Sequence, residues 1–120
     1  MIQQKLYGRL YLLLALMLGT FNLYAQQIVI VSADGTGDFK SIQAAINSLP
    51  VEAKEARIII IKKGIYNEKI FIEKNNITLK GETASNTIIT YAEGRDLFRC
   101  NNADDWGVAT VNLKGSDISL

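Results

Sequence analysis

Residues 31–50, with the sequence VSADGTGDFKSIQAAINSLP, decide how the rest of the chain is interpreted. The first half, Asp34–Asp38, places two glycines and two short acidic residues within five positions, which is typical of a tight turn with positive φ angles. In the second half Ser41 is placed to act as N-cap and Pro50 closes the segment. Apolar residues between them recur at helical spacing, namely Phe39, Ile42, Ile46 and Leu49. The stretch therefore predicts a turn followed by one short amphipathic helix over 41–48.

Short apolar, β-branched runs follow this helix. The segments are Ile58–Ile61, Ile70–Ile72, Ile77–Leu79, Ile88–Tyr91 and Val108–Leu113, and a further strand is expected over 26–31. No comparable helical pattern recurs, so we expect the helix over 41–48 to be the only sizeable one after residue 25. One helix ahead of a series of strands predicts a lid on the first coil of a β-solenoid, whose end otherwise exposes apolar interior and unpaired backbone.

A weak internal repeat supports stacked coils. Ile77–Gly81 and Val111–Gly115 share the pattern aliphatic, polar, Leu, Lys, Gly. Period-2 alternation excludes a helical repeat and predicts that the aliphatic and Leu side chains point inward while the polar one faces water. The pair Asn75–Asn76 can supply the left-handed conformation of a tight corner. Because 116–120 alternates in the same way and no cap follows, we expect these 120 residues to be the N-terminal part of a longer, truncated protein.

The first 25 residues have the pattern of a secretory signal peptide. Lys5 and Arg9 precede a leucine-rich run, and the small residue Ala25 offers a cleavage site. The run is shorter than the roughly 20 residues that a membrane-spanning helix needs. We therefore expect a mature chain of residues 26–120, secreted or periplasmic, with no stable membrane insertion after cleavage.

Charge and residue usage exclude several functions. Without Lys5 and Arg9 the mature chain has a net charge of about −1, so no nucleic acid partner is expected. The sequence contains no histidine, which rules out a Ser-His-Asp triad, a Cys-His pair and a His-ligated metal built from these residues alone. The single cysteine, Cys100, can form no disulfide within the chain, and we interpret it as a small half-buried hydrophobic residue.

Four segments in order resemble the opening of a pectinesterase (pectin methylesterase). They are Val31–Pro50, Ile61–Lys69, Asn76–Glu82 and Thr87–Thr90. The resemblance extends over Ile28–Leu120 and implies the N-terminal portion of a bacterial-type secreted member. The implied fold is an all-β, right-handed parallel β-helix (solenoid) with a short N-terminal capping α-helix and a long substrate cleft.

The resemblance also implies a reaction, the hydrolysis of the methyl ester on galacturonate units of pectin. Family members use two aspartates and no metal or cofactor, and glutamines stabilise the oxyanion. The family's catalytic motifs lie beyond Leu120, so we expect no catalytic residue in this chain, no metal site and no activity from the 120 residues alone. Pectin is the expected partner, and the full-length protein is expected to be a monomer.

Two residues are candidate substrate contacts, Asp105 and Trp106. The segment Asp104–Val108 precedes a strand at the place where family members often carry a substrate-contacting threonine; here that threonine is absent, and Thr110 does not obviously replace it. Adjacent residues on a strand face opposite ways, so Asp104 and Asp105 are interpreted as solvated loop charges. An exposed indole at Trp106 could stack on a sugar ring, whereas burial is the alternative.

Other local patterns predict structure rather than chemistry. Asp34 and Asp38 could suggest a calcium loop, but no bidentate Glu follows at the required spacing. Gly35-Thr36-Gly37 lacks the third glycine of a dinucleotide-binding loop. Two alternatives to the esterase remain at this stage: another β-helix polysaccharide enzyme, such as a calcium-dependent lyase, and a secreted solenoid that binds glycans without catalysis.

Overall fold

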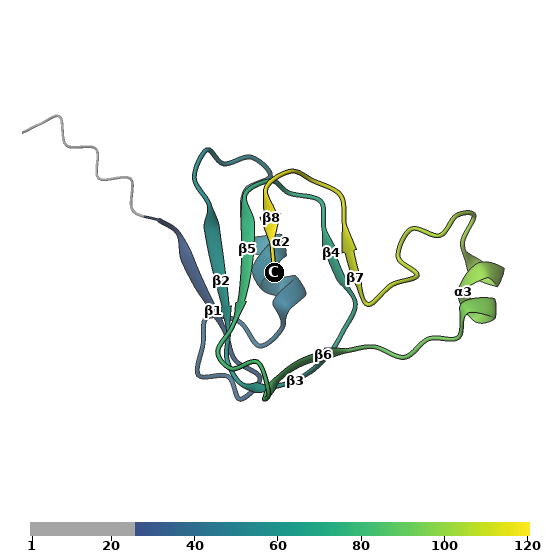
Figure 1. Cartoon of the computed structure of the whole chain (residues 1–120), viewed down its shortest axis with the longest axis horizontal. Coiled ribbons are helices and arrows are strands. Elements are labelled where there is room, and N and C mark those ends of the chain that lie inside the picture. Colours follow the sequence, from purple (N-terminus) through teal and green to yellow (C-terminus); the bar gives the residue numbers. More distant parts are fainter. Residues whose placement is uncertain (1–25) are drawn as a thin grey trace, which may run out of the picture.

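The computed structural model describes residues 26–120, which wind into successive coils of parallel strands (Figure 1). The elements in chain order are β1 (Ile28–Val31), α2 (Ile42–Ser48), β2 (Arg57–Ile61), β3 (Gly64–Asn67), β4 (Ile70–Ile72), β5 (Ile77–Gly81), β6 (Thr87–Thr90), α3 (Arg95–Asn101), β7 (Val111–Leu113) and β8 (Ile118–Ser119). They form one four-stranded sheet, β1-β2-β5-β8, and two two-stranded sheets, β3-β6 and β4-β7. All pairings within these sheets are parallel, so the predicted parallel β-helix is confirmed.

Aliphatic side chains stack from coil to coil inside the solenoid. In the four-stranded sheet Val29 lies opposite Ile59, which lies opposite Leu79, and all three are buried. Ile70 and Ile72 of β4 close the core from the third sheet and are fully buried. Because parallel in-register pairing places like positions above each other, the alternation of each strand becomes one continuous apolar column.

Helix α2 closes one end of the coil, as the sequence predicts. The Ser41 side chain accepts a hydrogen bond from the Ala44 amide at 3.1 Å and thereby caps the helix. Ile42 and Ile46 have 0% and 1% of their surface exposed, and the helix packs against β1, β2 and β4. Figure 1 shows α2 behind the opening of the coil, where it covers the apolar interior.

Two left-handed residues shape the same corner in two successive coils. Asn76 precedes β5 and Asp117 precedes β8, and both have φ of 55°. The sequence predicts the corner at Asn75–Asn76, and the structure assigns the left-handed conformation to Asn76. Asn and Asp tolerate this region better than other side-chain-bearing residues.

The expectation of a single sizeable helix is wrong, because α3 is as long as α2. Only Phe98 of α3 is buried, so the helix has no amphipathic stripe to reveal it. Favourable contacts at its ends are the other feature of this helix. Asp96 in the first turn and Arg99 in the last turn suit the helix dipole, and the Asn102 side-chain amide donates to the Phe98 carbonyl at 2.9 Å.

The internal repeat does not mark stacked coils. Its first copy contains β5, which pairs with β2 and β8, whereas its second copy contains β7, which pairs with β4. The long connection between β6 and β7 lengthens this coil, so residues at the repeat spacing belong to different sheets. The polar residue of the second copy, Asn112, was expected to face water, but it is buried.

Candidate functional site

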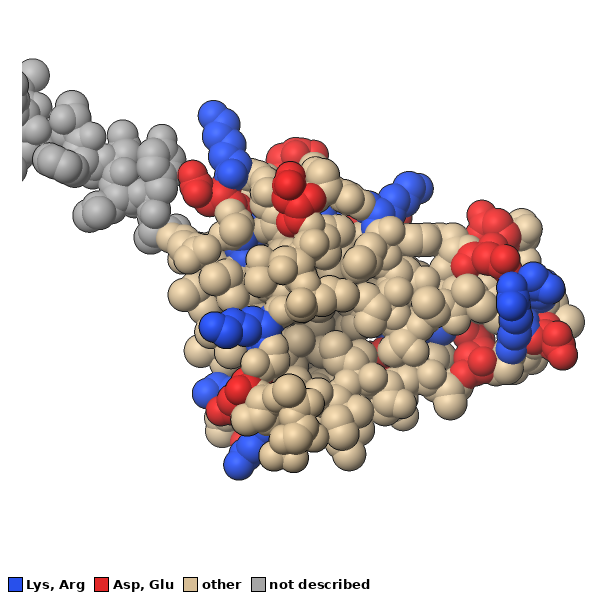
Figure 2. Space-filling model, viewed as in Figure 1, with Lys and Arg blue, Asp and Glu red and all other residues tan. Residues whose placement is uncertain are grey.

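The most prominent departure from the coil is the connection 91–110 between β6 and β7, called the arm below. The arm carries α3 and stands away from the three sheets in Figure 1. Acidic and basic side chains gather over it in Figure 2, whereas the centre of the same face carries few charges. Both predicted site residues, Asp105 and Trp106, lie on this arm.

Asp105 lies in an exposed loop and faces two arginines of α3. Its Oδ2 lies 3.7 Å from an Nη atom of Arg95, and its Oδ1 lies 3.5 Å from Nε of Arg99. Both separations exceed ordinary hydrogen-bond lengths, and all three side chains are more than half exposed. Together with neighbouring residues Asp105 lines a polar recess of about 490 Å³, whose walls are Arg99, Asn102, Ala103, Asp104 and Asp105. The predicted loop position of the acidic pair is confirmed.

Trp106 is partly exposed, with 39% of its surface open to solvent. Its ring meets Phe71 of β4 edge to face, with centroids 5.9 Å apart at 65°. Lys114 Nζ lies 5.9 Å from the indole centroid. The Asp104 carboxylate accepts a hydrogen bond from the Trp106 amide at 3.0 Å, which fixes the backbone there. The indole is therefore held at the root of the arm and remains accessible to a ligand.

Sequence reasoning missed Asn112, which ties the end of the arm to the coil. Its side chain accepts from the Gly107 amide at 3.1 Å and donates to the Ala109 carbonyl at 2.8 Å and the Ile70 carbonyl at 3.3 Å. Asn112 stands opposite Phe71 in the β4-β7 sheet, on its outer face. The only signal was a polar residue between Val111 and Leu113, a pattern that equally fits a solvent-facing position.

Gly107 allows the arm to approach this sheet closely. Its φ is 90°, and a Cβ at this position would lie 3.0 Å from the Phe71 ring. A larger residue would strain the backbone and displace the ring on which Trp106 rests. The root of the arm is thus fixed by packing and by hydrogen bonds.

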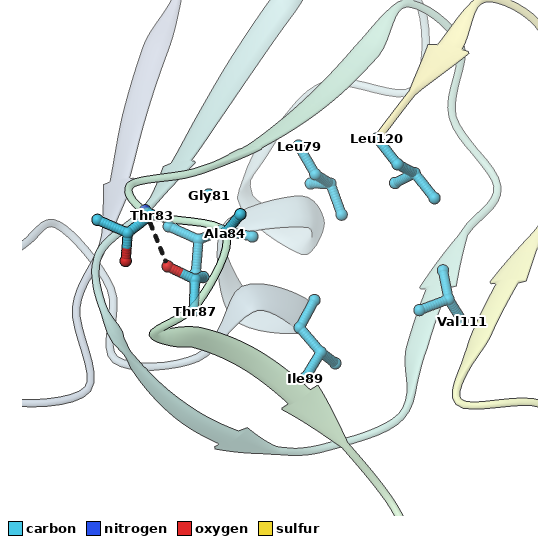
Figure 3. A pocket seen from close by; sticks show the side chains of 9 residues that line it. Leu79, Gly81, Thr83, Ala84, Thr87, Ile89, Val111 and Leu120 are labelled. Carbon is cyan, nitrogen blue, oxygen red and sulfur yellow. Dashed lines mark hydrogen bonds between the residues drawn. The ribbon is translucent and has the colours of Figure 1, made fainter.

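An apolar cavity of about 330 Å³ opens at the end of the coil opposite α2. Figure 3 shows Leu79, Ile89, Val111 and Leu120 around it, and the full lining is Ile61, Leu79, Gly81, Thr83, Ala84, Thr87, Ile89, Val111 and Leu120. None of these side chains is ionisable. The cavity therefore offers no ionisable acid or base, and its only polar side chains are the hydroxyls of Thr83 and Thr87. Its walls are strand residues together with the connection after β5 and Leu120.

Several carboxylates in the described part serve the backbone. Asp34 accepts hydrogen bonds from Ser32 Oγ, at 2.6 Å, and from the hydroxyl and amide of Thr36, and these bonds lower its pKa to about 2. Glu68 accepts from the Gln43 amide at 2.7 Å. The Lys63 amide bonds to Glu82, which lowers the pKa of that carboxyl. The interpretation of Asp34 as part of a structural turn fits these contacts.

Three further observations bear on the expectations from sequence. Cys100 is exposed on α3 and not half-buried, because only the face of this helix that carries Phe98 meets the coil. Within residues 26–120 no three His, Cys, Asp or Glu side chains come together as a metal site would require. The same part of the chain has no helix with the length and apolar character to span a membrane. The predicted signal peptide, residues 1–25, lies outside the described residues.

Comparisons with known proteins agree on one family. Residues 28–119 match the family described as Pectinesterase. The chain is 44% identical over 88 residues to pectinesterase 5 of Arabidopsis thaliana, covering 72% of this chain and 15% of that protein. It is 35% identical over 91 residues to pectinesterase A of Dickeya chrysanthemi, covering 73% of this chain and 24% of that protein. The chain thus spans less than a quarter of these relatives.

Solved structures show the same likeness in three dimensions. Pectin methylesterase from carrot has a TM-score of 0.61 and 28% identity, with 76% of this chain and 28% of that chain covered. A pectin methylesterase in complex with a hexasaccharide also has a TM-score of 0.61, at 29% identity, with 79% and 29% covered. The described coils therefore superpose on a limited part of each of these structures.

Proposed function

Because the chain belongs to the pectinesterase family, we propose that it forms the capped first coils of an enzyme that hydrolyses the methyl esters of galacturonate units in pectin. The observation that carries this proposal is the family match over residues 28–119, which coincides with the described parallel coils. The match favours the esterase over a β-helix lyase or a non-catalytic glycan-binding solenoid.

In this proposal the 120 residues supply scaffold and substrate contacts, and the catalytic aspartates belong to other coils. Asp34, Glu68 and Glu82 are engaged by backbone or hydroxyl donors. Asp105 faces the guanidinium groups of Arg95 and Arg99 in an exposed loop. We assign the arm, through Asp105 and Trp106, to contact with the polysaccharide. The sequence of residues 1–25 supports export to the periplasm or the exterior.

A chimeric enzyme tests the family function. Residues 28–119 would replace the matching segment of the Dickeya chrysanthemi pectinesterase A, to which the chain is 35% identical. We expect methanol release from methylated pectin within about tenfold of the parent enzyme. The same chimera with Ile46→Asp serves as an unfolded control. A chimera with native far-UV circular dichroism and no methanol release would contradict the proposal.

Kinetics of the chimera also test whether the arm binds substrate without taking part in the chemistry. Asp105→Asn should raise KM for pectin and leave kcat within about threefold, because a binding contact is lost while the chemistry is untouched. A fall in kcat by a factor of about a thousand would make Asp105 catalytic instead. The 120-residue chain alone should release no methanol, and activity from it would show that the catalytic groups are among these residues.

A further inference from the structure

A lysine that lies outside the arm contacts three residues of the arm. Lys69 lies between β3 and β4, and its side chain is only 14% exposed. The ammonium group pairs with Glu93, lies 4.6 Å from the ring centroid of Phe98 and lies 5.2 Å from that of Tyr91. Phe98 is the buried residue of α3, and Tyr91 and Glu93 belong to the start of the arm. One cation thus joins the first half of the arm to the coil.

The strand that follows Lys69 distributes its side chains between core and arm. Ile70 and Ile72 point inward and are fully buried. Lys69 and Phe71 occupy the alternate, outward positions, because successive residues of a strand face opposite sides. Lys69 holds the beginning of the arm and Phe71 packs against Trp106 at its end. The two attachments are therefore two residues apart, one directly before β4 and one within it.

We propose that Lys69 is a positioning residue, which fixes the arm so that Trp106 and Asp105 face the polysaccharide in one orientation. A cation enclosed by a carboxylate and two aromatic faces, with little water access, is held far more firmly than a surface ion pair. A neutral side chain here leaves Glu93 without its partner and the two rings without their cation. Arginine preserves the charge and stacks well on aromatic rings, so it should substitute for lysine. The part of this proposal that concerns polysaccharide rests on the proposed function.

Fluorescence tests the anchoring without reference to activity. Trp106 is the only tryptophan of the chain, so its emission reports on the root of the arm alone. In Lys69→Met we expect a red-shifted emission maximum and about twofold stronger quenching by acrylamide, since the indole gains water access. Lys69→Arg should behave as the original chain. Lys80→Met, which removes an exposed lysine of β5, is the matched control and should change nothing.

Two results would overturn the anchoring. One is quenching of Lys69→Met that equals that of the original chain, and the other is an equal effect of Lys80→Met. If Lys69→Met does not accumulate in folded form, Glu93→Gln takes its place, because it weakens the same anchor and keeps Lys69. Unchanged quenching in folded Glu93→Gln would then refute the proposal.

The chimera tests the consequence for substrate. Lys69→Met should raise KM for polymeric methylated pectin about tenfold and leave kcat within about twofold, whereas a general loss of structure lowers kcat as well. Lys69→Arg should restore KM. Altered quenching with an unchanged KM would overturn the positioning of substrate contacts. Inactivity of the unmodified chimera would refute the proposed function and leave the fluorescence result standing.

Discussion

The two ends of the described stack of coils are built alike but differ in how their apolar interior is covered. At the first end α2 covers the apolar interior, and side chains satisfy the backbone around it. The side chain of Gln43 accepts from the Phe71 amide at 2.8 Å and donates to the Phe71 carbonyl at 3.1 Å, so it replaces a neighbouring strand for β4. The Asp38 carboxylate accepts from the Ile30 amide at 2.9 Å and does the same for β1.

The helix that forms this lid is itself held at both termini. Glu68 accepts from the amides of Ile42 and Gln43 at its start, and Lys74 donates to the carbonyls of Ile46 and Asn47 at its end. The second end has none of these contacts among the described residues. It presents the apolar cavity, with Leu120 71% exposed. The comparison shows what covers the apolar interior at the first end, namely one helix and a small set of polar side chains that bond to the backbone.

The largest expected effect comes from breaking the lid. Ile46→Asp places a carboxylate at a position with 1% exposure, and the free energy of unfolding should fall by about 4 kcal/mol in urea denaturation. Ala44→Asp, an exposed site on the same helix, is the matched control and should cost less than about 0.5 kcal/mol. A change below about 0.5 kcal/mol for Ile46→Asp would place the apolar stripe in solvent and refute the lid.

Removing the Gln43 side chain, which takes the place of a neighbouring strand for β4, should lower the free energy of unfolding by less than Ile46→Asp does. Gln43→Ala deletes both hydrogen bonds to Phe71, and we expect a loss of about 2 kcal/mol in the free energy of unfolding because a half-buried amide and carbonyl lose their partners. Hydrogen exchange resolves the effect by residue. The Phe71 amide should exchange faster in the variant, while the Ile59 amide in the four-stranded sheet keeps its protection. Equal protection of Phe71 in both proteins would contradict this role of Gln43.

The open end should promote self-association of the 120-residue chain. Leu120→Lys places a charge at the cavity, and we expect association measured by sedimentation to weaken about tenfold, which corresponds to about 1.4 kcal/mol. Leu97→Lys is the control, since Leu97 is similarly exposed at 62% but lies on α3. If both variants weaken association equally, general charge and not the open end is responsible.

The smallest expected effect is on stability at low pH. Asp34, in the turn before α2, has a folded pKa of about 2 against an ordinary value of 3.8, chiefly because Ser32 and Thr36 donate to it. A depressed folded pKa contributes stability above the unfolded pKa, and this contribution disappears as the pH falls from about 4 to about 2. The thermal midpoint of Asp34→Asn should therefore decline less steeply over this range. Parallel declines of the thermal midpoint in the variant and the original chain would show that ionisation of Asp34 contributes nothing to the pH dependence of stability.

Local signals made the first end predictable. The turn, the Ser41 cap and the stripe that includes Ile46 lie within one short segment, and each has its own physical rule. Strand positions also followed from β-branched runs such as Arg57–Ile61. The parallel β-helix and its family came from resemblance over the whole stretch, which the family match confirms.

The arm was only partly predictable, because long-range contacts stabilise it. The sequence indicated Asp105 and Trp106 as candidates, and the structure places them together on an accessible loop, while their role in binding stays a prediction. Asn112 gave only an ambiguous signal and Lys69 gave none, since Ile70, which Asn112 bonds, and the aromatic partners of Lys69 lie far away along the chain. The repeat misled because it measured spacing along the chain, and spacing along the chain does not fix the sheet to which a strand belongs.

The corner formed by Asn76 and Asp117 has a consequence for how such a protein can change. Both residues turn the chain into the same sheet, although the coil from β5 to β8 is about twice as long as the coil from β2 to β5. The additional residues of the longer coil are inserted between the end of one strand and the start of the next. Doubling the length of a flexible loop costs only about 0.6 kcal/mol in closure entropy. Insertions and deletions in the arm can thus leave the register of the sheets unchanged. A lineage can therefore vary what the arm presents while inheriting an unchanged frame.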